Sequence, residues 1–144
     1  MERRIAMAND HAGYDLKMVL KGELEADGWE VLDLGCDDKN AVDYPVFGRK
    51  LADAIRDGKV ERGVLVCGSG IGISIAANRE PTVRAALVHD ALGARLCREH
   101  NDANVLCLGG QTTGVAVAKD CLKVFLATPF AEGRHSPRVR MLGN

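Results

Sequence analysis

The sequence predicts an α/β fold in three layers, with a five-stranded parallel sheet in the middle and helices on both of its faces. Two observations predict it. Short β-like runs alternate five times with helix-length segments along the 144 residues, an order that builds a doubly wound parallel sheet through right-handed crossovers. Two of the runs, 63–67 and 104–108, are almost wholly apolar, as expected for strands covered on both faces.

The boundaries of the elements carry local signals. We expect strands at 4–8, 30–34, 63–67, 84–88 and 104–108, and helices at 13–26, 45–57, 70–78, 91–99 and 114–127. Pro45 is expected at a first helical position, after Asp43 as a cap. Pro81 and Pro129 follow two of the helices, where they would stop them. Because no repeat or linker interrupts the series, we expect one domain over residues 1–144.

Composition excludes several classes of function. The net charge is −1 and only 4% of residues are aromatic, and no basic stripe is present, so nucleic acid is not an expected partner. The apolar runs are too short for a membrane span and the first residues form no signal peptide, so we expect a cytoplasmic protein with no membrane partner. Five cysteines without a Cys-x-x-Cys pair predict reduced thiols. No metal-ligand spacing is present, so we expect no metal and no other cofactor.

Ligands of such sheets bind beyond the carboxyl ends of the strands, which makes the residues after the third strand candidates. Cys67 ends that strand, and Gly68-Ser69-Gly70-Ile71-Gly72 follows it. Glycines there let a ligand approach the amides at a helix start, where the helix dipole favours negative charge. The spacing matches neither a dinucleotide loop nor a Walker loop. Ile73 occupies the position where a cysteine-phosphatase loop needs arginine, which excludes that class as well.

Each candidate at this edge also has a purely structural interpretation. Cys67 is either a thiol whose thiolate the amides favour, suited to moving a proton to and from carbon, or a small buried hydrophobe. Ser69 either bonds the thiol or substrate or caps the next helix. Asp10 and His11, after the first strand, either hold phosphate and shuttle protons or are a cap and an exposed ring. The glycine loop could be a tight turn without a ligand.

A second group of polar residues falls at the other edge of the predicted sheet. His100 and Asn101 follow the fourth helix, just before the last strand. If they are catalytic, either the loop reaches around the sheet or a second subunit supplies them. Near the C-terminus, Ser136-Pro137 predicts the cap and first residue of a short helix. Arg134 and Arg138 could then clamp a phosphate, or belong to a solvated basic tail.

Five blocks of the sequence together resemble one known family. They are NDHAGYDLK (9–17), VDYP (42–45), VCGSGIGISIAANR (66–79), REHNDANVLCLGG (98–110) and GRHSPRV (133–139). In this order, and over essentially the whole chain, they are similar to the ribose-5-phosphate isomerase B family, which includes galactose-6-phosphate and allose-6-phosphate isomerases. The resemblance implies a flavodoxin- or Rossmann-like sheet. It also implies metal-free interconversion of ribose 5-phosphate and ribulose 5-phosphate through an enediolate, in homodimers or tetramers whose sites are shared between subunits.

The resemblance also implies a role for each candidate residue. His100, helped by Asp10, would open the furanose ring, and Cys67 would then move a proton between C2 and C1. The other matching positions contact the sugar, its phosphate or the enediolate: Ser69 and Tyr44 at the sugar, His11, Arg134 and Arg138 at the phosphate, and Asn101 with the amides of Gly68, Gly70, Ile71 and Gly72 at the enediolate.

Two positions depart from the family pattern. Some members have a carboxylate base where this chain has Ile73, and its absence here favours the cysteine version of the mechanism. Many have an arginine where this chain has Gln111, so this chain lacks one candidate phosphate contact. Allose 6-phosphate, galactose 6-phosphate and erythrose 4-phosphate are therefore alternative substrates. A non-catalytic phosphosugar-sensing module is a further alternative, although it would not need Cys67 and His100 together.

Overall fold

A computed structural model describes residues 3–143 and contains all ten predicted elements, with ends within two residues of those expected. The strands β1 to β5 are Arg4–Asn9, Glu30–Asp33, Gly63–Cys67, Ala85–Leu87 and Val105–Gly109. The helices α1 to α6 are Tyr14–Ala26, Tyr44–Arg56, Ile71–Ala77, Ala91–Asn101, Val115–Ala127 and Ser136–Arg140.

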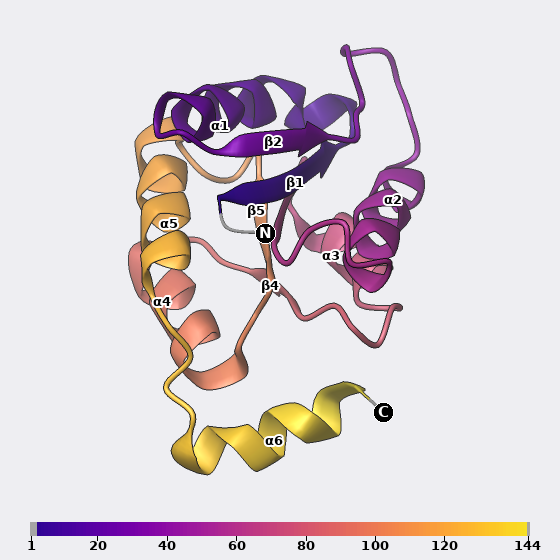
Figure 1. The fold of residues 1–144 in the computed structure, drawn as a ribbon. Helices are drawn as coiled ribbons and strands as arrows, with labels where there is room; N and C mark the ends of the chain where they lie inside the picture. Colours follow the sequence, from indigo (N-terminus) through magenta and orange to yellow (C-terminus); the bar gives the residue numbers. More distant parts are fainter. Residues whose placement is uncertain (1–2, 144) are drawn as a thin grey trace.

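The sheet is parallel throughout and confirms the predicted three-layer class. Helices α1, α4 and α5 cover one face, and α2 and α3 cover the other (Figure 1). The strand order is β2-β1-β3-β5-β4, which exchanges the last two strands of the flavodoxin order. Burial explains the exchange. Every residue of β5 is buried, whereas the three residues of β4 are only partly buried and suit an edge.

Two helix starts differ from the sequence prediction. Asp43 occupies the cap position of α2 but its side chain makes no capping hydrogen bond, and Pro45 is the second helical residue. At α6, the cap position is taken by His135 rather than Ser136, because a 3-10 turn at Gly133–His135 leads directly into the helix. Helix α6 lies apart from both helical layers (Figure 1).

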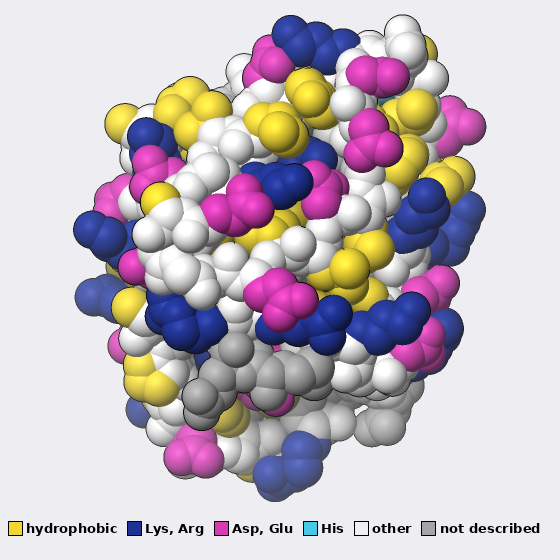
Figure 2. Space-filling model, turned by 45° about the horizontal axis from the view of Figure 1, so that its top comes forward, with side chains coloured by type: hydrophobic (Ala, Val, Ile, Leu, Met, Phe, Trp, Pro, Cys, Tyr) yellow, Lys and Arg dark blue, Asp and Glu magenta, His cyan; other side chains and the backbone are white. Residues whose placement is uncertain are grey.

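The surface mixes charges of both signs. Figure 2 shows Lys and Arg side chains interspersed with Asp and Glu over one face of the molecule. Within residues 3–143, no helix combines the length and the apolar character needed to cross a membrane.

The turns at the carboxyl edge of the sheet touch one another through their backbones. A Cβ added to Gly13, in the turn after β1, would lie 2.3 Å from the carbonyl oxygen of Val66 in β3. A Cβ on Gly110, after β5, would lie 2.8 Å from the carbonyl oxygen of Ala12. Real Cβ atoms do not approach this closely, so only glycine permits these contacts. The turns after β1, β3 and β5 are therefore held as one unit.

We predict that Gly13→Ala destabilises the protein by at least about 1–3 kcal/mol, because the new methyl group collides with backbone that cannot move aside. The matched control is Gly22→Ala on α1, where an added Cβ meets nothing within 4 Å; it should stabilise by about 0.5–1 kcal/mol. Denaturant unfolding curves of the two variants measure both effects. Equal stability of Gly13→Ala and the wild type would contradict the close contact.

Candidate active site

The carboxyl ends of β1 and β3 lie side by side and form a topological switch point. From β1 the chain crosses to β2 at one side, and from β3 it crosses to β4 at the other. Such a divergence opens a crevice outside the strand ends, where ligands bind. Asp10 and His11 follow β1, and Cys67 ends β3. The amide of Asp10 donates to Val66 at 3.2 Å, so the two groups are joined.

Cys67 combines both of the properties that the sequence left open. Its side chain is 4% exposed, so it is buried, and its sulfur accepts the amide N–H of Gly70 at 3.1 Å. Gly70 has φ +77°, a left-handed conformation that turns this amide back towards the thiol. The thiol therefore lies against the amide of Gly70, the cap residue of α3.

The other four cysteines lack this setting. All five thiols are free. Burial raises the pKa of Cys97 and of Cys121 to about 11, and it also raises the pKa of Cys36 and of Cys107. These four side chains therefore stay protonated at neutral pH, and only Cys67 ends a strand against a helix start.

Within the glycine loop, Ser69 and Ile71 are hydrogen-bonded to each other, whereas Gly72 is not. The hydroxyl oxygen of Ser69 accepts the amide of Ile71 at 3.2 Å, but the cap position of α3 is taken by Gly70, without a side-chain cap. The O–H of Ser69 remains able to donate to a ligand. The amide of Gly72 is in the first turn of α3, where the helix offers no acceptor. Tyr44, the first residue of α2, lies over this position, since a Cβ on Gly72 would be 2.5 Å from its ring.

Asp10 and His11 are each oriented by one backbone amide. Asp10 is 6% exposed, and its Oδ1 accepts the N–H of Gly13 at 3.1 Å. His11 accepts the N–H of Val42 at its Nδ1, at 3.2 Å, so the ring proton lies on Nε2. The second carboxylate oxygen and this N–H remain available to a ligand. Capping and ligand binding are thus compatible at this turn.

His100 and Asn101 lie at the opposite edge of the sheet, as the topology predicted. Helix α4 starts at the carboxyl edge and ends at the amino edge, where the carbonyl of Asn104 accepts the N–H of Gly63 at 2.9 Å. The length of β3, roughly 3.3 Å per residue, therefore separates this edge from Cys67. Six residues line a hollow of about 260 Å³ there: His100, Asn101, His135, Arg138, Val139 and Leu142. Arg134 is in the turn before α6 and is not among them.

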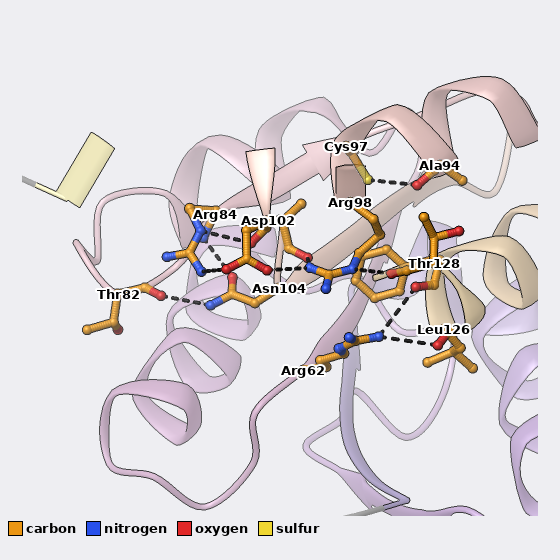
Figure 3. A network of polar contacts seen from close by, with 12 residues as sticks. Arg62, Thr82, Arg84, Ala94, Cys97, Arg98, Asp102, Asn104, Leu126 and Thr128 are labelled. Atoms are coloured by element: carbon orange, nitrogen blue, oxygen red, sulfur yellow. Dashed lines mark hydrogen bonds and ion pairs between the residues drawn. The ribbon is translucent and has the colours of Figure 1, made fainter. Parts of the chain in front are cut away.

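A network of ion pairs fixes the end of α4 that carries His100 (Figure 3). Asp102 ends the helix with φ +47°. Its carboxylate accepts hydrogen bonds from Arg98 at 2.8 Å and from Arg84 at 3.4 Å. Arg98, with a side chain 6% exposed, also donates to the carbonyl of Thr128 at 3.0 Å. The network ties the helix end to the start of β4 and to the end of α5.

Sequence reasoning gave no role to two residues that touch the candidate site. The amide of Gln111 donates to the carbonyl of Gly68 at 2.9 Å, and its side-chain oxygen lies 3.0 Å from where a Cβ on Gly68 would be. Its position after the last strand was a usable signal. His135 stacks on His100, with ring centroids 4.5 Å apart and planes at 16°. Residues 35 apart carry no local signal for such a contact.

The described part of the chain, 3–143, places no three His, Cys, Asp or Glu side chains where they could hold a metal ion together. The chemistry that these residues offer is acid, base and anion binding. One edge carries a thiol, a carboxylate, an imidazole and helix-start amides, and the other carries two imidazoles, a carboxamide and an arginine.

Fold and site together define an α/β protein with a thiol, a carboxylate and an imidazole grouped at the switch point of a parallel sheet. The chain belongs to the ribose/galactose isomerase family, whose family model matches residues 5–142. It is 38% identical over 140 residues to ribose-5-phosphate isomerase B of Escherichia coli K12, covering 97% of this chain and 94% of that protein. The predicted family is therefore confirmed.

Solved structures with similar folds agree with this assignment. Ribose-5-phosphate isomerase B of Clostridium thermocellum superposes with a TM-score of 0.96 at 44% identity, covering 97% of this chain and 95% of that one. The ribose 5-phosphate isomerase of Thermotoga maritima also gives 0.96, at 42% identity, with 99% of each chain covered.

We predict that Asp102→Asn, which tolerates the left-handed backbone but removes the charge, lowers the free energy of unfolding by about 1.5–3 kcal/mol. The nearly buried Arg98 then loses its carboxylate. As a control, Asp53→Asn breaks a pair with Arg56 whose side chains are 53% and 47% exposed, and should cost less than about 1 kcal/mol. Equal losses in chemical denaturation would show that the network contributes no more than a surface ion pair.

Proposed function

We propose that this chain interconverts ribose 5-phosphate and ribulose 5-phosphate by proton transfer through an enediolate, without a metal. The observation that carries the proposal is the Cys67 sulfur held against the Gly70 amide at the switch point, 3.1 Å away. Membership of the ribose/galactose isomerase family supports an aldose–ketose isomerase. A thiol that must stay reduced fits a cytoplasmic enzyme.

The first step opens the furanose ring. His100 donates a proton to the ring oxygen O4 while Asp10 accepts the proton of the C1 hydroxyl. The C1–O4 bond breaks and leaves an aldehyde at C1. General acid–base groups of this kind contribute about 10²–10⁴-fold to a rate.

The second step moves one proton between carbons. Cys67, as the thiolate, takes the proton from C2 and becomes the thiol, and the electron pair delocalises onto the C1 oxygen as an enediolate. Amide N–H groups of Gly68 and Gly72, with the Asn101 side chain, stabilise this oxyanion, a contribution of about 2.7–4 kcal/mol per well-placed donor. The thiol then returns the proton to C1. Ser69 relays the proton of the C2 hydroxyl to the C1 oxygen, which leaves a ketone at C2.

The remaining candidate residues are assigned to binding the phosphate and the sugar chain of the substrate. His11 presents its Nε2 proton to the phosphate, and Arg134 and Arg138 neutralise its charge as guanidinium donors. Tyr44 lies over Gly72 and forms a wall beside the sugar.

Because the two groups of residues lie at opposite edges of the sheet, we propose that a second copy of the chain completes each site. One protomer gives Cys67 and the residues around it, and its partner gives the residues around His100. Exposed apolar side chains beside both groups support a dimer. Ile71 and Ile75 are 51% and 55% exposed next to the glycine loop, and Met141 and Leu142 are 74% and 58% exposed near His100.

The family covers ribose and galactose isomerases, and the same proton chemistry serves hexose 6-phosphates. The names of the E. coli relative and of both structural neighbours favour the pentose. Values of kcat/KM for ribose 5-phosphate and galactose 6-phosphate measure this preference.

Cys67→Ala is expected to slow the exchange of the C2 proton of ribose 5-phosphate with solvent by about 10²–10⁴-fold, because the group that accepts this proton is removed. The control Cys121→Ala removes a buried thiol from α5 and should keep the wild-type rate. Exchange is followed by NMR in heavy water with a chelator present. Wild-type exchange in Cys67→Ala would refute the assigned base.

His100→Asn is expected to impair only the substrate that has a ring. Ribose 5-phosphate closes a furanose through O4, whereas ribulose 5-phosphate cannot close one because its O5 carries the phosphate. The variant should lose about 10²–10⁴-fold in the turnover of ribose 5-phosphate and retain exchange of the C1 protons of ribulose 5-phosphate. The exposed His89 supplies the control, His89→Asn. Equal losses with both substrates would remove His100 from ring opening.

A further inference from the structure

The ring of His100 rests on a second histidine. His135 comes from the turn that precedes α6, far along the chain from α4, and the two rings stack nearly parallel at 4.5 Å. His135 is 9% exposed, whereas His100 is only partly buried, and both rings line the hollow. The more accessible His100 ring therefore rests on a nearly buried one.

Asp102 and the stack restrain different parts of His100. The ion pairs of Asp102 fix the backbone at the end of α4, but they leave the side-chain torsions of His100 free. The stack with His135 restrains those torsions, because a face-to-face contact allows the imidazole to slide or turn in its own plane and not to swing away. A planar group held in this way is oriented before substrate arrives.

The charge state of His135 suits this task. Its burial, together with the nearby His100, Arg134 and Arg138, lowers the pKa of His135, and Glu99 opposes this only in part. His135 therefore remains neutral in a cationic neighbourhood. A neutral ring places no second positive charge against His100 when His100 carries the proton that it gives to the sugar.

We propose that His135 is a positioning residue for ring opening, which holds the imidazole of His100 in line with the ring oxygen of the sugar. The inference rests on the proposed function, in which His100 is the acid of that step. His135 itself touches neither the sugar nor the phosphate in this arrangement.

Two substitutions at position 135 separate stacking from hydrogen bonding. His135→Phe keeps a flat ring without nitrogen atoms, and His135→Gln keeps hydrogen-bonding groups without a ring. His135→Gln should lower kcat for ribose 5-phosphate by about ten- to a hundredfold, with KM nearly unchanged, because the acid is misoriented. His135→Phe should keep most of kcat. Neither should greatly slow C1 proton exchange of ribulose 5-phosphate, which has no ring to open.

The same variants in the His100→Asn background complete the test. There, His135→Gln should have no further effect, since the residue that it positions is gone. The proposal is overturned if His135→Phe is as impaired as His135→Gln, if both substrates lose equally, or if the two losses multiply in the double variant. Those results would indicate a direct contact with the phosphate or sugar.

A measurement without substrate separates this inference from the proposed function. The four histidines give resolvable ring resonances, and His100→Asn identifies the one from His100. The ring current of His135 should shift that resonance upfield in the wild type. The shift should persist in His135→Phe and vanish in His135→Gln. An unchanged His100 resonance in His135→Gln would refute the stack even if the enzyme is an isomerase, and a lost shift with no isomerase activity would refute the function alone.

Discussion

Backbone contact between the turns after β1, β3 and β5 is the constraint on which the carboxyl-edge site depends. Gly13 against the Val66 carbonyl and Gly110 against that of Ala12 bring main chains together without side chains between them. Asp10 and Cys67 are consequently placed by the sheet rather than by flexible loops. A site built on backbone contacts keeps its geometry when no ligand is present, which is a form of preorganisation.

At the amino edge, side-chain contacts rather than backbone contacts hold the candidate residues in place. The carboxylate of Asp102 joins Arg84 and Arg98 (Figure 3), and the His100 ring lies on His135. Charged and stacked contacts of this kind are more adjustable than glycine turns. The two halves of the candidate site therefore differ in rigidity. The more rigid half, at the carboxyl edge, holds Cys67, to which we assign the proton transfer at carbon.

The sequence sufficed for the elements and for the carboxyl-edge group, because both are local. Apolar runs define β3 and β5, and the glycines after Cys67 define a close turn. The position of β4 at the edge was not predicted, since it depends on which of β4 and β5 is more fully buried in the folded sheet. The contacts of Asp102 with Arg84 and of His135 with His100 were also missed, because they join segments that are distant in the sequence. For Asp10 and Ser69 the sequence left a structural and a functional interpretation as alternatives. In the structure one oxygen of each side chain accepts a backbone N–H of its turn, and the rest of the group remains free to bind a ligand.

Helix α4 carries His100 across the full height of the sheet from the edge that holds Cys67. In a pair of chains that exchange these edges, every site draws on both polypeptides and every polypeptide contributes to two sites. A chain defective at Cys67 paired with one defective at His100 would then place both defects in one site and leave the other site whole. Two inactive proteins mixed in this way would regain a share of the activity. Whether a site is active would then depend on the combination of chains in the dimer rather than on either chain alone.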